Sequence, residues 1–153
     1  MTELESTTWI AAPPGAVWRV LTTLEALGRY DPGVTRATLR PSGGTPGVGT
    51  IRRCELARGG WFDERVTEWR VDEALAFELT AGTAPLKRFV HRTALIAENG
   101  GTRVTRKMAY DLKFGALGAF FDGVVARRKF EEGLAAFFDG LKRFVEAGAT
   151  SGA

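Results

Sequence analysis

The sequence predicts a single α+β domain, in which one long helix lies across the concave side of a curved antiparallel sheet. Three observations lead to this prediction. The last apolar stretch, 114–145, has helical periodicity. Upstream of it, short segments have the alternation and the β-branched and aromatic residues typical of strands. Turn signals rich in Gly, Pro, Asn and Asp separate those segments. Successive antiparallel strands with helices on one face form an α+β domain.

The chain begins with a predicted strand and short helical segments. Residues 3–11 alternate loosely and are rich in Thr and aromatic residues, which indicates a strand. Pro13-Pro14-Gly15 ends it, and proline suits the first turn of a helix because its missing N–H is not needed there. We expect a short helix over 16–24, followed by one more turn as far as Leu27.

Six further strands are predicted before the long helix. Asn99-Gly100-Gly101 is the strongest hairpin signal between them, because these residues accept positive φ. The chain has no internal repeat and no second composition regime, so we expect one domain over 1–147 and a frayed tail over 148–153. The six strands are expected at 34–39, 48–56, 61–70, 75–80, 88–97 and 102–112.

The long helix has a broad apolar face that two kinds of residue interrupt. Arg127 and Glu131 lie near the middle of that face, one turn apart. Gly123, Gly133 and Gly140 lie inside the helical pattern, where each costs about 1 kcal/mol relative to alanine. Such a cost indicates close backbone approach, a bend, or space left open beneath the helix.

Composition excludes several classes of function. The 153 residues have a formal net charge of only +3, with basic and acidic residues interleaved, so we expect no nucleic-acid partner. One cysteine and one histidine form neither an intrachain disulfide nor a zinc site, and we expect no metal and no cofactor. The N-terminus lacks a secretory pattern and no apolar run is long enough to span a bilayer. We therefore expect a cytoplasmic protein without stable membrane insertion, and nothing indicates its oligomeric state.

Four stretches together resemble the START-like (SRPBCC) superfamily, in its polyketide cyclase/dehydrase-like branch. They are the opening I-A-A-P-P-G-A-V-W-R-V-L-T, the central E-R-V-T-E-W, the hairpin G-G-T-R-V-T, and the ending F-G-A-L-G-A-F-F-D…L-K-R-F-V-E. The resemblance runs from about residue 3 to 147. It implies a helix-grip fold, with a seven-stranded antiparallel sheet around the C-terminal helix, and a hydrophobic cavity for lipids, polyketides or similar molecules. The superfamily shares no catalytic set, so no catalytic residue is carried over.

Arg127 and Glu131 are the first candidates for polar groups in such a cavity. Arginine stays charged and offers a fork of donors to a carboxylate, enol or carbonyl of a ligand. The alternative is an exposed i,i+4 pair that contributes tenths of a kcal/mol.

His91 and Glu64 are candidates on the predicted sheet. His91 shares a face with Phe89, Thr93 and Leu95 and would be a general acid or base if that face lines the cavity. The alternative that we favour is a histidine at the rim or surface. Glu64 is either a buried carboxylate paired with Arg53 or Arg106, or part of an ion pair on the solvent face.

The remaining cavity candidates are aromatic or apolar. Tyr30 and Tyr110 would present a phenol to a ligand, or would be core or rim aromatics. Cys54 is interpreted as a small strand residue rather than a nucleophile. Residues placed on the cavity side by strand or helix periodicity are Met108, Phe120 and Val124.

Three functions follow, in order of preference. The first is binding of a hydrophobic small molecule in an internal cavity. The second is a cyclase or dehydratase type of enzyme, whose cavity holds a reactive chain in one conformation while polar groups move protons. The third is a protein-interaction or ribosome-associated module. Convergence of polar side chains in one pocket favours the enzyme, and a filled interior with an exposed apolar or basic patch favours the third.

Overall fold

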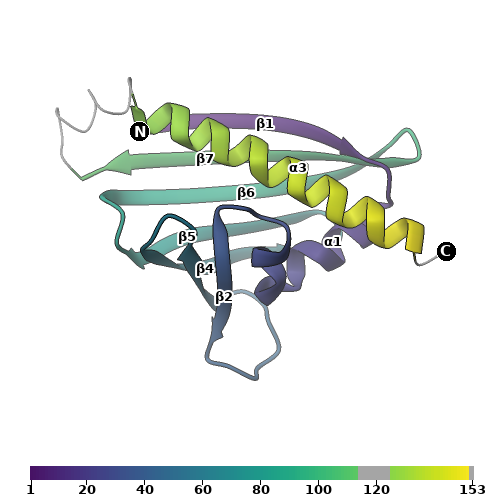
Figure 1. The fold of residues 1–153 in the computed structure, drawn as a ribbon. Coiled ribbons are helices and arrows are strands. Elements are labelled where there is room, and N and C mark those ends of the chain that lie inside the picture. The colour runs from purple at the N-terminus through teal and green to yellow at the C-terminus, as the bar shows by residue number, and fades with distance from the viewer. Residues whose placement is uncertain (114–124, 152–153) are drawn as a thin grey trace.

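A seven-stranded antiparallel sheet with a long C-terminal helix across one face forms the fold (Figure 1). The computed structural model describes residues 1–113 and 125–151. The strand order is β1-β7-β6-β5-β4-β3-β2, which confirms the predicted fold class. The elements are β1 (Thr2–Ile10), α1 (Pro14–Thr22), the 3-10 helix η1 (Leu24–Arg29), β2 (Val34–Arg40), β3 (Ile51–Leu56), β4 (Trp61–Arg70), β5 (Ala74–Gly82), β6 (Leu86–Glu98), β7 (Gly101–Leu112) and α3 (Arg127–Ser151).

The strands follow the sequence pattern closely, with one informative difference. The predicted hairpin at Asn99-Gly100 joins β6 to β7, and both residues have positive φ, 50° and 75°. The strand expected from residue 48 begins instead at Ile51. Residues 47–50 form a turn, in which the Thr50 hydroxyl accepts a hydrogen bond from the Gly47 N–H at 3.0 Å. The prediction missed this turn because Val48 and Thr50 are themselves strand-type residues.

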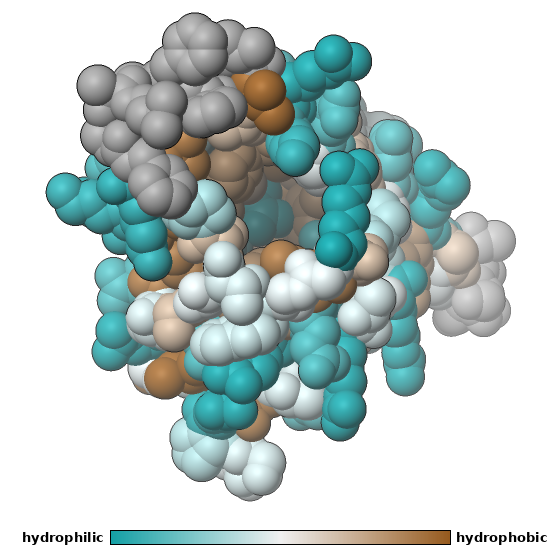
Figure 2. Space-filling model, turned by 60° about the vertical axis from the view of Figure 1, so that its left-hand side comes forward, coloured by the Kyte–Doolittle hydropathy of each residue, from teal (hydrophilic) through white to brown (hydrophobic). Residues whose placement is uncertain are grey.

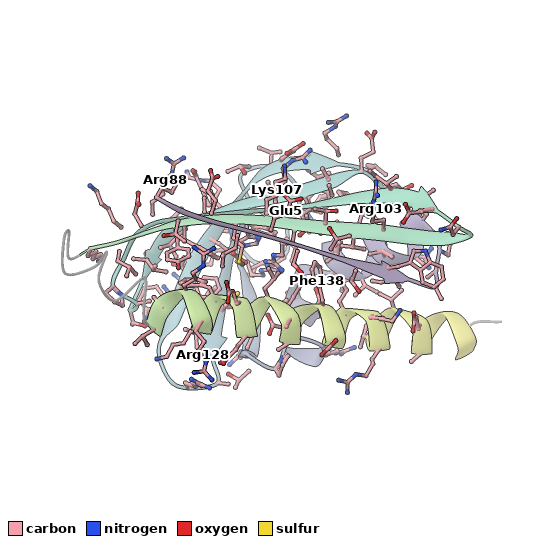
Figure 3. All side chains as sticks on the ribbon, turned by 90° about the horizontal axis from the view of Figure 1, so that it is seen from above. Glu5, Arg88, Arg103, Lys107, Arg128 and Phe138 are labelled. Carbon is pink, nitrogen blue, oxygen red and sulfur yellow. The ribbon has the colours of Figure 1, made fainter. Side chains whose placement is uncertain are left out.

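The core lies between the inner face of the sheet and the apolar face of α3. Phe138 points from α3 toward the sheet, whereas Arg128 points away from it (Figure 3). Burial of each large apolar side chain contributes roughly 1.5–3 kcal/mol, so this face fixes α3 to the sheet. Among the side chains of α3 that the structure describes, five are buried there, namely Leu134, Phe137, Phe138, Leu141 and Val145.

The C-terminal half of α3 is in close contact with the rest of the protein. A β-carbon at Gly140 would overlap with the backbone carbonyl of Tyr30, so only glycine fits there. Lys142 Nζ donates to the carbonyl of Trp9 at 2.6 Å, and Glu146 Oε1 accepts from the Ala11 N–H at 3.0 Å. The helix continues to Ser151, into the segment that we expected to fray.

The N-terminal half of α3 is different. A β-carbon at Gly133 would have no heavy atom within 4 Å. Close approach, one of the explanations considered for the helix glycines, therefore applies at Gly140, whereas Gly133 is exposed and lies beside open space. Gly123 lies outside the described residues. No helix in the described part of the chain is long and apolar enough to span a membrane.

Candidate ligand-binding cavity

A cavity of about 280 Å³ lies between the N-terminal half of α3 and the inner face of the sheet. At about 30 Å³ per molecule of liquid water, it has room for about nine waters, or an organic molecule of on the order of ten heavy atoms. Figure 2 shows a hollow on this side of the molecule, with hydrophobic residues around it and hydrophilic residues in its depth. It is lined by Leu27, Asp31, Gly33, Val34, Arg52, Leu56, Phe62, Glu64, Leu79, Gly82, Ala84, Leu86, Phe89, His91, Arg106, Met108, Phe130, Gly133, Leu134 and Phe137.

Two other hollows are larger but more open to solvent. One, of about 600 Å³, lies along β1, β5, β6 and β7 beside the surface ion pair of Glu5 and Lys107. Figure 3 shows both of these residues on the side of the sheet away from α3. The other, of about 580 Å³, lies between Gly28–Pro32 and the C-terminal half of α3. The inner cavity is the site of interest because its walls are apolar and several ionisable side chains are buried in it.

Arg52 and Glu64 form a buried ion pair at one side of this cavity. They lie opposite each other in the register of β3 and β4. Arg52 Nε donates to Glu64 Oε1 at 2.9 Å, its Nη2 donates to the same oxygen, and its Nη1 donates to the carbonyl of Leu24 at 3.3 Å. Every nitrogen of this guanidinium therefore has an acceptor.

His91 connects this pair to a second arginine, Arg106. His91 Nε2 lies 2.8 Å from Glu64 Oε2, and Arg106 Nη2 lies 2.8 Å from His91 Nδ1. A carboxylate only accepts and a guanidinium only donates, so Nε2 carries the proton and Nδ1 is the acceptor. The imidazole is therefore neutral, and it stacks on Phe77 with ring centroids 5.1 Å apart.

Burial and neighbouring charges set the protonation states in this network. Burial and then the charge of Arg106 lower the pKa of His91 to about 4, against a partial offset from Glu64. Burial opposes ionisation of Glu64, but Arg52 and the hydrogen bonds that the carboxylate accepts outweigh it and lower its pKa to about 2. Burial raises the pKa of Cys54, whose Sγ lies 3.8 Å from Glu64, to about 12, so this thiol is not a nucleophile.

Arg106 differs from Arg52 in its partners. Its Nε is buried and is the one buried side-chain nitrogen or oxygen without a hydrogen-bond partner among the described residues. Its guanidinium carbon lies 4.0 Å from the ring centroid of Phe137, a cation–π contact that holds the group in place. Burial lowers its pKa, with Glu64 acting in the opposite direction.

The structure places three of the predicted site residues on the cavity wall: Glu64, His91 and Met108. His91 is buried, so the interpretation as a rim or surface histidine was wrong. Arg53 was also wrong as a partner for Glu64, because it pairs instead with Asp63, from Nε to Oδ1 at 2.7 Å.

Other predicted residues lie behind the wall or outside the described part. Tyr30 is buried against Phe137 and Phe144, and burial raises its pKa to about 12. Tyr110 stacks on Phe130, with ring centroids 4.1 Å apart, and so supports a residue of the wall. Two further candidates, Phe120 and Val124, lie outside the described residues.

Arg127 and Glu131 do not line the cavity. Their side chains are 50% and 55% exposed, and Arg127 Nε lies 3.3 Å from Glu131 Oε1. The apolar stripe of α3 runs through Phe130, Leu134 and Phe137, and long side chains at its edge extend into water without desolvating their charges. The expectation that this pair points into the cavity was wrong. The alternative, an exposed i,i+4 ion pair, is what the structure shows.

Reasoning from the sequence missed two ionisable residues of the cavity, Arg52 and Asp31. The short connection between β3 and β4 implies a register that places Arg52 opposite Glu64, and this signal would have identified it. Asp31 was interpreted only as a turn residue, and its Oδ1 does accept the Gly33 N–H at 2.9 Å. It also lines the cavity, and burial raises its pKa against the opposing effects of that N–H and of Arg106.

Comparison with protein families identifies the chain. The family described as "Polyketide cyclase / dehydrase and lipid transport" matches residues 1–146. The chain belongs to this family. The match confirms the resemblance to the START-like superfamily. None of the curated proteins compared with the chain matches its sequence.

Solved structures similar to this chain support the fold. TTHA0849 from Thermus thermophilus is 23% identical, with a TM-score of 0.80 over 96% of this chain and 99% of that one. Ara h 8.0201 is 15% identical, with a TM-score of 0.73 over 95% and 98%. XoxI from Bacillus cereus is 15% identical, with a TM-score of 0.69 over 95% and 96%. At these identities the likeness establishes the helix-grip architecture and not an activity.

Proposed function

We propose that this protein binds a hydrophobic small molecule in the cavity between the sheet and α3. The observation that carries the proposal is the cavity itself, about 280 Å³ with mainly apolar walls and a few convergent polar groups at one side. Membership of a family described by lipid transport and polyketide chemistry supports the same function. Because the interior is hollow here, a protein-interaction module with a filled core is disfavoured.

The cavity sets how affinity depends on ligand length. Each buried methylene contributes about 0.8 kcal/mol, or about a fourfold gain in affinity. Across the n-alcohols from hexanol to dodecanol, we expect affinity to rise by about this factor per carbon and then to stop rising when the chain fills the cavity. Calorimetric titration measures the series. A flat series, or no binding of any member, would refute the proposal.

A pair of leucine variants on α3 tests the position of the ligand. Gly133→Leu places a side chain in the open space at the cavity wall and should weaken decanol binding at least tenfold. Both positions are exposed, but Ala135 does not line the cavity, so Ala135→Leu should leave binding unchanged. Equal effects of both variants would place the ligand elsewhere. Native mass spectrometry of protein purified from its own host would show the class of molecule that co-purifies.

A second function, proton transfer of the cyclase or dehydratase type, is favoured by Asp31. An acid–base enzyme needs a cavity group that exchanges a proton with the substrate. Glu64 and His91 are engaged with their neighbours through both carboxylate oxygens and both ring nitrogens, whereas Asp31 lines the cavity with a raised pKa. The Arg106 guanidinium, which also lines the cavity, would donate to an enolate oxygen.

Hydrogen–deuterium exchange of an apolar ketone tests this second function. In D₂O, the protein should accelerate exchange at the carbons next to the carbonyl of 2-nonanone, and Asp31→Asn should abolish the acceleration without abolishing binding. Nuclear magnetic resonance follows the exchange. Binding of 2-nonanone without accelerated exchange would leave the protein a binder and not an enzyme of this kind.

A further inference from the structure

The two arginines of the cavity have different electrostatic partners. Arg52 forms an ion pair with Glu64, and each of its three nitrogens has an acceptor. Within the described part of the chain, Arg106 has no carboxylate within 4.0 Å, and its hydrogen bonds go from Nη2 to the neutral ring of His91. One guanidinium is therefore neutralised and the other is not.

Arg106 is nevertheless buried, with a side chain that lines the cavity and only 9% of the residue exposed. A buried charge is costly unless an opposite charge or several hydrogen bonds compensate it. The ring of Phe137 compensates part of this cost, but the Nε–H has no acceptor. Because the arginine side chain lines the cavity, an acceptor on a bound ligand would compensate the rest of this cost.

The charges around Arg106 give the sign of that acceptor. Arg52 and Arg106 contribute +2, Glu64 contributes −1, and His91 is neutral because of its hydrogen-bond partners, so these four side chains carry +1. Asp31 also lines the cavity and its charge acts on Arg106, but one of its oxygens is bound by the Gly33 N–H and no ion pair joins it to either arginine. A negative charge on a ligand would supply the close partner that Asp31 does not.

We propose that the ligand is an organic anion, an apolar chain or ring system with one acidic head group such as a carboxylate, and that Arg106 binds the head group. The inference rests on the proposed function and specifies its ligand class. The Arg106 guanidinium donates to an oxygen of the head group, while the apolar body lies against the part of the wall around Phe89, Phe130 and Leu134. The arrangement suits a carboxylate because guanidinium–carboxylate hydrogen bonds are roughly twice as strong as neutral ones.

Two probes of equal length separate this inference from the proposed function. We would titrate the full-length protein with decanoate and with 1-decanol at pH 7.5, and measure both affinities by calorimetry. Both probes have the same ten-carbon chain and differ in the charge of the head group. We expect decanoate to bind at least tenfold more tightly than decanol.

Two matched variants test the role of Arg106. Arg106→Gln removes the charge but keeps a donor for His91, and should weaken decanoate at least tenfold while changing decanol less than twofold. Arg103→Gln also removes one arginine from β7, but on the opposite face of the sheet, and should change neither affinity (Figure 3). If Arg106→Gln does not fold, the ratio of the two probes on the unmodified protein still decides the question.

The outcomes are distinct. Equal binding of decanoate and decanol by the unmodified protein would overturn the anion inference and leave the hydrophobic ligand in place. Equal weakening of both probes by Arg106→Gln would remove Arg106 as the head-group ligand. Failure of both probes to bind would overturn the proposed function and, with it, the inference.

Discussion

Two glycine-to-alanine variants on α3 should have opposite effects on stability. Both remove the helix penalty of glycine, worth about 1 kcal/mol. At Gly133 the new methyl group meets open space, so we expect stabilisation by up to about 1 kcal/mol. At Gly140 it would overlap with the backbone carbonyl of Tyr30, which cannot move aside as a side chain would. Overpacking typically costs about 1–3 kcal/mol, and contact with backbone belongs at the upper end.

The two variants should therefore differ by about 2 kcal/mol or more in the free energy of unfolding. Urea titration measures this difference, provided that the dependence on denaturant is the same for both variants. In thermal unfolding, about 2–4 °C per kcal/mol is expected for a chain of this size. Variants that agree within about 0.5 kcal/mol, or a Gly140→Ala protein more stable than the unmodified one, would refute the reasoning.

Three other predictions concern single side chains. The His91 pKa of about 4 lies below the ordinary value of about 6.5, so the unfolded chain binds a proton at a higher pH than the folded protein does. The free energy of unfolding should therefore fall by about 3 kcal/mol as the pH drops from about 6.5 to about 4. The single imidazole signal should not titrate above about pH 5, and a midpoint near 6.5 would contradict the buried neutral state. Cys54, buried with a raised pKa, should react with a thiol reagent only after unfolding, and rapid labelling of the native protein would disprove its burial. Arg127→Ala should change the affinities for decanol and decanoate less than twofold, because the side chain is exposed. A larger loss of affinity would show that Arg127 contacts the ligand after all.

The sequence was sufficient for the order of the elements and for most of their boundaries. Periodicity and turn chemistry are local properties, so the Asn99-Gly100 hairpin and strand β4 were predicted as they are observed. The site depended instead on which residues lie opposite one another across strands. Arg52 was missed for this reason, and Arg53, its neighbour, was chosen although its side chain lies on the other face.

Predictions about orientation on α3 failed for a related reason. A helical wheel places Arg127 and Glu131 near the apolar face, but it does not show where the stripe that contacts the sheet is centred. His91 was underestimated because an ionisable residue on a strand is usually exposed, and only its contacts with Glu64 and Arg106 explain its burial.

The close contacts of α3 near Gly140 hold the helix at one point, so a change of its tilt there moves its N-terminal end most. From that point to Arg127 the helix extends about 20 Å at 1.5 Å per residue. A tilt of about 5° around Gly140 would displace the Arg127 end by about 2 Å while barely moving Tyr30. Such a tilt would change the width of the cavity, so substitutions at the Tyr30–Gly140 contact should alter which ligands fit although neither residue lines the cavity.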